Sequence, residues 1–244
     1  MIIEQIPIGP MANFGYILGC EETRIAALID PAFEPEKLIA RARELDLDVE
    51  WILNTHGHFD HINGNEVAVK MTGAKIIAHC GAAFHTDKKV DHGDKIKIGN
   101  LHVDILFTPG HCPDEICFFV NGQVIFTGDV LFVGECGRTD LPGSNVEDMY
   151  ISLFQTLASI PDDVDMFPGH DYGSSPMSTM GFERANNYVL KPRSLSEFIT
   201  FTPFTFKIFS LIKSVSKAPQ ILVLLIFAFN ITLIALFRLL SLSK

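Results

Sequence analysis

The chain has 244 residues, of which 19 are basic and 29 acidic, and its net charge at neutral pH is −10. Five of the basic residues and none of the acidic ones follow Glu197, so residues 1–199 carry a net charge of −15. An acidic body of this kind repels nucleic-acid phosphates, which excludes nucleic acid as an expected partner. The length is sufficient for one large domain with a substantial core.

The cysteines and the N-terminal residues indicate the cellular compartment in which the protein is expected. The five cysteines are odd in number and include no CxxC pair, and the opening MIIEQIPIGP lacks the basic and long apolar regions of a signal peptide. We therefore expect reduced thiols and a cytoplasmic catalytic domain.

The first third of the chain predicts strands followed by a helix. Short β-type runs are expected at residues 2–8, 14–20 and 24–29, with turns between them. Apolar residues at i, i+3 and i+4 spacing predict a helix at 35–45. The apolar run EWILNT then predicts a buried strand.

The pattern of strands and helices continues to about residue 199. A helix at 62–71 precedes the strand KIIAH, and four β-type runs between 95 and 127 are separated by turn signals. Helical spacing returns at 146–159, the short strand VDMFPG follows, and a weaker helix is expected at 177–190. This alternation predicts a layered α/β domain in which helices cover the sheets.

Residues 200–244 form a hydrophobic tail of different composition. Residues 221–237 read ILVLLIFAFNITLIALF, with only Asn230 and Thr232 as polar interruptions. At about 1.5 Å per residue this segment is near the lower limit for crossing a hydrocarbon core. Lysines precede it, which favours a C-terminal membrane anchor that holds the domain on the cytoplasmic side. A buried core helix or an interfacial hairpin is the alternative.

The stretch THGHFDH concentrates metal-ligand residues directly after a predicted strand. His56 and His58 alternate along it and can project toward one point, while Asp60 and His61 turn toward a second point close by. Imidazole and carboxylate groups suit Zn²⁺, Fe²⁺ or Mn²⁺. Four ligands within six residues rarely complete a catalytic centre by themselves, so further ligands are needed.

Three further ligand-type residues follow apolar runs downstream. His111 follows VDILF in TPGHCPD, Asp129 follows QVIF in TGD, and His170 follows a short run in DMFPGHDYG. A glycine stands beside each of them and lets the backbone turn sharply. Sites in layered α/β proteins assemble at strand ends, so we expect these side chains to join the THGHFDH stretch in one metal site.

The set THGHFDH, PGH, GD and PGH resembles the metallo-β-lactamase fold superfamily, in its hydroxyacylglutathione hydrolase (glyoxalase II) branch. The resemblance covers about residues 1–199 and also includes NFGYIL, IDPA, CGRTDLPGS and GHDYG. It implies an αββα sandwich with a metal site at one edge of the β layers. His56, His58 and His111 would hold the first metal, Asp60, His61 and His170 the second, and Asp129 would bridge them.

The resemblance also implies a reaction. Two zinc ions, with iron or manganese as alternatives, would hold a bridging hydroxide that attacks a thioester or ester carbonyl. Asp60 and Asp129 would act in catalysis by fixing the ligand geometry and orienting the nucleophile. The expected substrate is a small-molecule thioester, for example a glutathione conjugate.

The chain departs from this pattern after His111. The segment HCPDE stands where the family has a sequence similar to HTPGS, so Asp114 and Glu115 bring two carboxylates toward the site. The separate helical domain that binds glutathione in longer relatives is also missing from the resemblance. Arg138 is a candidate for binding a substrate carboxylate, with an ion pair to Asp140 as the alternative. Tyr172 is a candidate for lining the cleft, with simple packing as the alternative.

Two other functions remain open from the sequence. A persulfide dioxygenase, a relative that also has a CGRTD segment, would use one iron bound by His56, His111 and Asp129. A membrane-tethered scaffold without catalytic activity would keep the fold for binding alone, but it has no need of all seven ligand positions.

Overall fold

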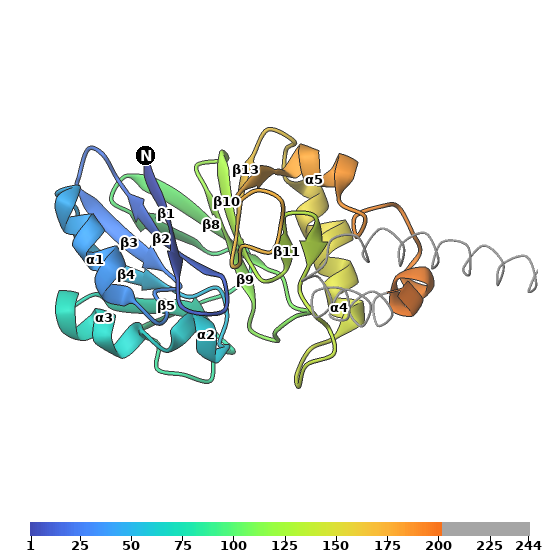
Figure 1. Cartoon of the computed structure of the whole chain (residues 1–244), viewed down its shortest axis with the longest axis horizontal. Helices are drawn as coiled ribbons and strands as arrows, with labels where there is room; N and C mark the ends of the chain where they lie inside the picture. The colour runs from blue at the N-terminus through green and yellow to red at the C-terminus, as the bar shows by residue number, and fades with distance from the viewer. Residues whose placement is uncertain (202–244) are drawn as a thin grey trace, which may run out of the picture. The chain divides into compact units, whose positions relative to one another are not determined.

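Two six-stranded sheets face each other, and helices lie on the outer side of each, so the layers run α, β, β, α (Figure 1). The computed structural model describes residues 1–201, and Met1–Phe198 form one unit. The αββα sandwich expected from the sequence is therefore confirmed for this part of the chain.

The first sheet has the strand order β1-β2-β3-β4-β5-β6. Its first three strands are antiparallel, whereas β3, β4, β5 and β6 run parallel. The carboxyl ends of the parallel strands therefore meet at one edge. The strands are β1 (Ile2–Ile8), β2 (Asn13–Gly19), β3 (Ile25–Ile29), β4 (Asp48–Leu53), β5 (Lys75–His79) and β6 (Lys88–Val90).

The second sheet has the order β14-β13-β10-β9-β8-β7. The pair β10 and β13 is parallel, and the other neighbours are antiparallel. A small ribbon of β11 (Leu131–Phe132) and β12 (Glu135–Cys136) follows β10. The strands of the sheet are β7 (Lys95–Ile98), β8 (Leu101–Phe107), β9 (Ile116–Val120), β10 (Val124–Gly128), β13 (Asp165–Pro168) and β14 (Ser178–Thr179).

The helices differ from the expected ones in three places. The helix expected at 62–71 begins only at Asn65, after a turn that brings Gly64 so close to the carbonyl oxygen of Pro31 that a side chain would collide with it, and Ile62 ends a separate short helix. The helix expected at 177–190 is limited to Met180–Asn186, because Ser178 and Thr179 pair as a strand. The helix expected at 146–159 changes to π-helical and then 3₁₀ geometry. The helices are α1 (Pro35–Glu44), α2 (Phe59–Ile62), α3 (Asn65–Thr72), α4 (Val146–Ile151) with its extensions η1 (Ser152–Thr156) and η2 (Leu157–Ser159), and α5 (Met180–Asn186).

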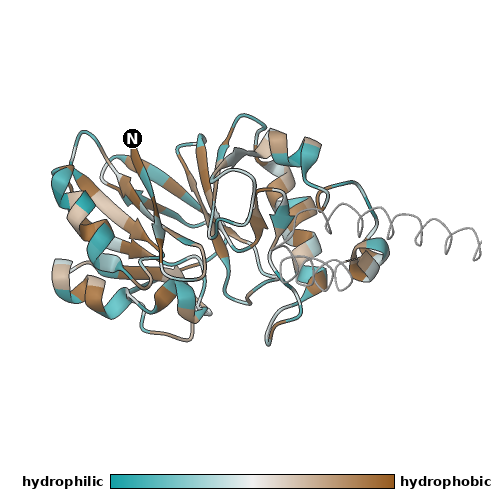
Figure 2. Cartoon of the chain, viewed as in Figure 1, coloured by the Kyte–Doolittle hydropathy of each residue, from teal (hydrophilic) through white to brown (hydrophobic). Residues whose placement is uncertain are grey.

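Apolar side chains fill the space between the two sheets and the space under α1. Hydrophobic residues are frequent along the strands of both sheets (Figure 2). The core between the sheets includes the fully buried Phe118 and Phe126. On α1, the predicted apolar face is buried through Leu38, Ile39 and Ala42. The two sheets are thereby held rigidly together, with their strand ends side by side at one edge.

The expected membrane anchor needs correction. No helix within residues 1–201 is long and apolar enough to cross a membrane, and the segment 221–237 on which the expectation rested lies outside the described residues. The membrane-anchored localisation expected from the sequence is therefore not supported. The division of the chain into a domain 1–199 and a tail 200–244 stays a prediction.

Candidate metal centre

Seven histidine and aspartate side chains meet where strands of both sheets end. The loop after β4 supplies His56 and His58, and α2, which begins directly after His58, supplies Asp60 and His61. The second sheet supplies the other three from segments that follow β8, β10 and β13, namely His111, Asp129 and His170. The parallel strands β3, β4, β10 and β13 all end here, which is the edge at which the sequence predicts the site.

The first ligand set consists of His56, His58 and His111. Nε2 of His56 lies 3.0 Å from Nδ1 of His58, and Nε2 of His111 lies 2.9 Å from the same Nδ1. The three ring nitrogens lie within 4.8 Å of one another, so one ion could contact all of them. His56 and His111 are buried, whereas His58 is partly exposed.

The second ligand set consists of Asp60, His61 and His170. Nε2 of His61 lies 3.2 Å from Nε2 of His170, and Oδ2 of Asp60 lies 3.7 Å and 3.4 Å from these two nitrogens, respectively. These atoms also lie within 4.8 Å of one another. A second ion could therefore bind beside the first.

Asp129 lies between the two sets. Its Oδ2 is 3.5 Å from Nε2 of His111 in the first set and 3.2 Å from Nε2 of His170 in the second. Its Oδ1 is 3.4 Å from Nε2 of His61. Gly169 packs directly against Oδ1, where a Cβ atom would collide with the carboxylate. This arrangement matches a carboxylate that bridges two ions.

Four of the five histidines have an acceptor opposite the ring nitrogen that faces away from the set. The distance from Nδ1 to this acceptor is 2.9–3.1 Å in each case. The acceptor is Oγ1 of Thr55 for His56 and Oδ2 of Asp30 for His61. It is the carbonyl oxygen of Arg138 for His111 and that of Met11 for His170. These acceptors hold the proton on Nδ1 and leave the lone pair of Nε2 facing inward.

The donor chemistry of this cluster fits divalent metal ions. Unprotonated nitrogens 2.9–3.2 Å apart repel each other unless a cation or a proton lies between them. Oδ1 of Asp129 is buried and has no hydrogen-bond partner among the described residues. A buried polar atom without a partner costs free energy, and an ion bound between the sets would remove that cost.

Burial and neighbouring charges shift the pKa of the histidines in the two sets in opposite directions. Burial, assisted by the neighbouring histidines, lowers the pKa of His56, His58 and His111. Burial acts in the same sense on His61 and His170, but it is outweighed by the charge of Asp129 on both, by the hydrogen bond of His61 to Asp30 and by the contact of His170 with Oδ2 of Asp129, so the pKa of both is raised. The histidines of the second set therefore bind protons more readily than those of the first.

Two supporting residues of the second set escaped the sequence reasoning. Asp30, at the end of β3, accepts hydrogen bonds from Nδ1 of His61 and from Oγ1 of Thr55. Asn13, at the start of β2, donates from Nδ2 to both Oδ2 and the carbonyl oxygen of Asp60. The signal for Asp30 was its place in IDPA directly after a predicted strand, because β3 is parallel to β4 and ends beside it.

Asp114 and Glu115 are buried beside the loop that carries His56 and His58. Oδ1 of Asp114 accepts hydrogen bonds from the backbone N–H of Gly57 and from Sγ of Cys112, and Oε1 of Glu115 accepts one from the backbone N–H of Asp129 at 2.6 Å. Burial raises the pKa of the Glu115 carboxyl well above its ordinary value. Both side chains thus support the loops that carry the ligands.

The two candidate substrate residues have different surroundings. The guanidinium of Arg138 is exposed and makes two hydrogen bonds to Asp140, at 2.8 and 3.0 Å, which is the alternative the sequence left open. The ring of Tyr172 stacks on His170 with centroids 4.6 Å apart. Tyr172 therefore lies beside the second set, and substrate binding by either residue stays a prediction.

Comparison with known proteins identifies the family. Residues 16–170 match the family model of the metallo-beta-lactamase superfamily. The chain belongs to this superfamily. The resemblance noted in the sequence is thereby confirmed, and the superfamily fold implies a divalent metal ion, as the histidine and aspartate sets do.

Relatives within the superfamily carry two activities. A hydroxyacylglutathione hydrolase of Polaromonas sp. is 39% identical over 179 residues, which cover 70% of this chain and 67% of that protein. The human mitochondrial persulfide dioxygenase ETHE1 is 33% identical over 178 residues, which cover 72% of this chain and 70% of that protein. The chain thus matches about two thirds of the length of these curated relatives.

A solved structure is similar over most of the described chain. The crystal structure of ETHE1 from Myxococcus xanthus has a TM-score of 0.79 and 33% sequence identity, and it covers 83% of this chain and 90% of that one. Metallo-hydrolases and a dioxygenase therefore both occur among the relatives of this chain.

Proposed function

We propose that this protein is a metal-dependent hydrolase of thioesters, with two zinc ions as its cofactor. The observation that carries the proposal is the position of Asp129, whose Oδ2 lies 3.5 Å from His111 of the first set and 3.2 Å from His170 of the second. A bridging carboxylate between two complete sets suits a pair of ions. The similarity to hydroxyacylglutathione hydrolases supports the same reaction.

Bound divalent ions would supply an activated water and polarise the carbonyl of the substrate. The chain itself supplies orientation. Asp60 is held by Asn13, and Asp129 by the backbone contact with Glu115, so both carboxylates keep fixed directions. From these directions they orient the attacking water in the cleft.

No dedicated acid is required for the leaving group. A thiol has a pKa of about 8.5, so a thiolate leaves without proton donation in the transition state. This suits a cleft whose titratable groups are mostly committed to ligand positions. A small-molecule thioester, with a glutathione conjugate as one form, is the substrate class that we propose.

A second candidate is a persulfide dioxygenase with one iron ion. The similarity to persulfide dioxygenases supports it, and His56, His111 and Asp129 would form a two-histidine, one-carboxylate set. In that case the second set would hold no ion of its own.

Metal quantification and two assays separate these functions. Purified protein is loaded with zinc or with iron, its metal content is measured, and it is tested for hydrolysis of S-lactoylglutathione and for oxygen uptake with glutathione persulfide. Two zinc ions per chain with thioester hydrolysis support the hydrolase. One iron ion with oxygen uptake and no hydrolysis would overturn it. A scaffold without activity predicts that His58→Ala leaves cellular function intact.

A further inference from the structure

Large apolar side chains are exposed beside the second ligand set. Met11, Phe59 and Tyr172 are 49%, 72% and 39% exposed, and each belongs to a segment that supplies or supports a ligand of this set. Exposed apolar side chains that gather at one place on a soluble protein mark a binding surface. The question is what this surface binds.

Phe59 stands between His58 and Asp60 and begins α2. One side of its ring packs edge-on against Phe33, with centroids 6.3 Å apart, and most of its surface remains open to solvent. Phe33 in turn packs against Gly9 in the turn between β1 and β2, so closely that a side chain at position 9 would collide with its ring. Phe33 thus connects the ring of Phe59 to the turn between β1 and β2.

The same turn leads to the other end of this surface. Two residues after Gly9, the carbonyl oxygen of Met11 accepts the hydrogen bond from Nδ1 of His170 at 3.0 Å. The hydroxyl of Tyr172 reaches this carbonyl oxygen at 3.5 Å, and its ring stacks on His170 at an interplanar angle of 10°. Phe59, Met11 and Tyr172 thus belong to segments that supply or contact the second ligand set, and together with Phe33 we call them the apolar strip.

The strip also carries no charge. None of its four side chains is charged, and Glu34, which accepts a hydrogen bond from the backbone N–H of Gly9, adds a carboxylate beside it. The exposed guanidinium of Arg138 is already bound by Asp140 through two hydrogen bonds. An uncharged, hydrocarbon-like group is therefore the ligand that fits the strip.

We propose that the apolar strip binds the hydrocarbon chain of an acyl thioester while the ester carbonyl lies at the ligand sets. This inference rests on the proposed hydrolase function and names its substrate class. In the reaction the oxygen of water bonds to the acyl carbon, the carbon–sulfur bond breaks, and the products are a carboxylate, a thiol and a proton. The strip itself takes no part in bond making and sets only the preferred acyl length.

Acyl thioesters of N-acetylcysteamine test this directly, because their thiol part is small and uncharged. We expect kcat/KM of the zinc-loaded full chain to rise at least about tenfold from the acetyl to the octanoyl ester, since burial of the added methylenes on the strip favours the longer acyl chain. Phe59→Ala and Met11→Ala reduce this octanoyl-to-acetyl ratio to less than about threefold. A wild-type ratio near one with the acetyl ester hydrolysed would overturn the inference and leave the hydrolase function standing.

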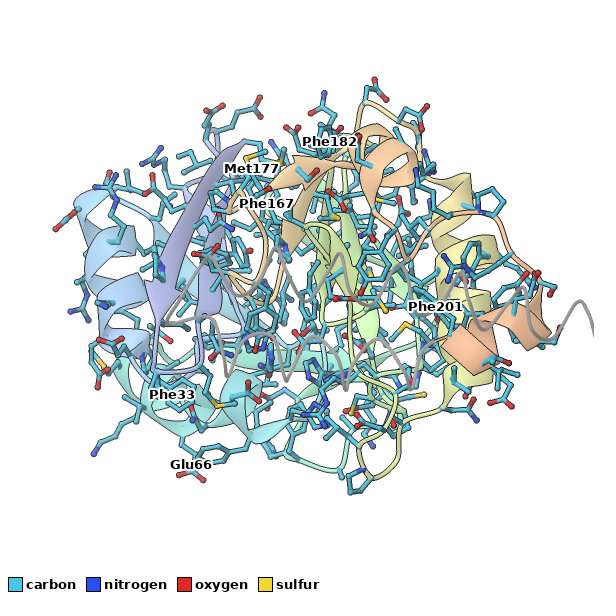
Figure 3. All side chains as sticks on the ribbon, turned by 45° about the vertical axis from the view of Figure 1, so that its right-hand side comes forward. Phe33, Glu66, Phe167, Met177, Phe182 and Phe201 are labelled. Carbon is cyan, nitrogen blue, oxygen red and sulfur yellow. The ribbon has the colours of Figure 1, made fainter. Side chains whose placement is uncertain are left out.

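Phe182→Ala is the matched control. Phe182, on α5, is 56% exposed and lies far from Phe33 in the view of Figure 3. We expect this variant to keep the wild-type ratio. An equal loss in Phe182→Ala would show a general effect of removing surface aromatic rings and would overturn the inference.

Binding of the product carboxylates gives a second readout that needs no turnover. Calorimetry with the zinc-loaded chain should show tighter binding of octanoate than of acetate, and Phe59→Ala should reduce the difference. If no thioester is hydrolysed, the proposed hydrolase function is wrong. Equal affinities for octanoate and acetate would then also overturn the proposal that the strip binds a hydrocarbon chain. A homodimer that dissociates in Phe59→Ala would show that the strip binds a second copy of the chain, which would also contradict the inference.

Discussion

Oδ2 of Asp30 lies 3.0 Å from Nδ1 of His61, on the side of the imidazole ring that faces away from the second ligand set. The same oxygen accepts the hydroxyl hydrogen of Thr55, whose Oγ1 lies 3.1 Å from Nδ1 of His56 in the first set. One buried carboxylate thus supports a histidine of each set.

Replacement of Asp30 tests this support. In Asp30→Asn the side chain keeps its size but loses its charge, so His61 is less well oriented and less basic. We expect zinc affinity to fall about 10–100-fold, with the ion of the second set lost first. Competition with a chromogenic chelator measures both affinities. The exposed Asp163→Asn serves as the control, and an equal loss there would contradict the role of Asp30.

Thr55 connects the two sets through its hydroxyl. Thr55→Val removes the acceptor for Nδ1 of His56, and the buried N–H left without a partner costs about 1–3 kcal/mol. We expect affinity for the first ion to fall about tenfold, whereas Thr55→Ser retains it because the hydroxyl remains. Zinc titration of the three proteins distinguishes the outcomes, and similar loss in the serine variant would point to a packing effect.

Acidification should release the ion of the second set first. The pKa of His61 and His170 is raised, so protons compete with the metal there as the pH falls, while the lowered pKa of His56, His58 and His111 keeps the first set unprotonated.

Two variants that each disable one set separate these contributions. As the pH is lowered, we expect zinc content to fall first in His58→Ala, which retains the second set, and only at a lower pH in His170→Ala, which retains the first. Equilibrium dialysis followed by metal analysis provides the measurement. Parallel curves for the two variants would contradict the assignment.

The core between the sheets should be sensitive to loss of volume. Phe118 on β9 is fully buried, so Phe118→Ala removes its contacts and leaves a cavity. We expect a loss of about 3–5 kcal/mol in the free energy of unfolding. Phe119, next to it on the same strand, faces the other way and is partly exposed, so Phe119→Ala should cost clearly less. Urea unfolding of the metal-free proteins gives both values.

The clustering of the candidate ligands could be predicted because their signals are local. His56, His111, Asp129 and His170 each follow an apolar run and stand near a glycine, and the ends of parallel strands meet at one edge. The hydrogen-bond partners of these residues, in contrast, come from segments distant in the sequence. Nothing near His170 in the sequence indicates that it donates to the carbonyl oxygen of Met11, 159 residues away.

The failures of the sequence reasoning have physical causes too. The periodicity over residues 62–71 suits one helix, but the close approach of Gly64 to Pro31 separates α2 from α3. Hydropathy alone suggested an anchor at 221–237, outside the described residues, and no helix within residues 1–201 could span a membrane. Asp114 and Glu115 lie near the site as expected, but nothing in the sequence indicated that they accept hydrogen bonds from the backbone N–H groups of Gly57 and Asp129.

Each candidate ligand set draws side chains from both halves of the sandwich. The loop after β4 belongs to the first sheet, whereas His111, Asp129 and His170 belong to the second. Bound ions would therefore act as cross-links between the sheets. A free ion concentration of about 100 times the dissociation constant adds about 2.7 kcal/mol to the free energy of unfolding. Because the sheets cannot part while the ions remain, metal supply would determine how long the chain survives proteolysis as well as how fast it turns over substrate.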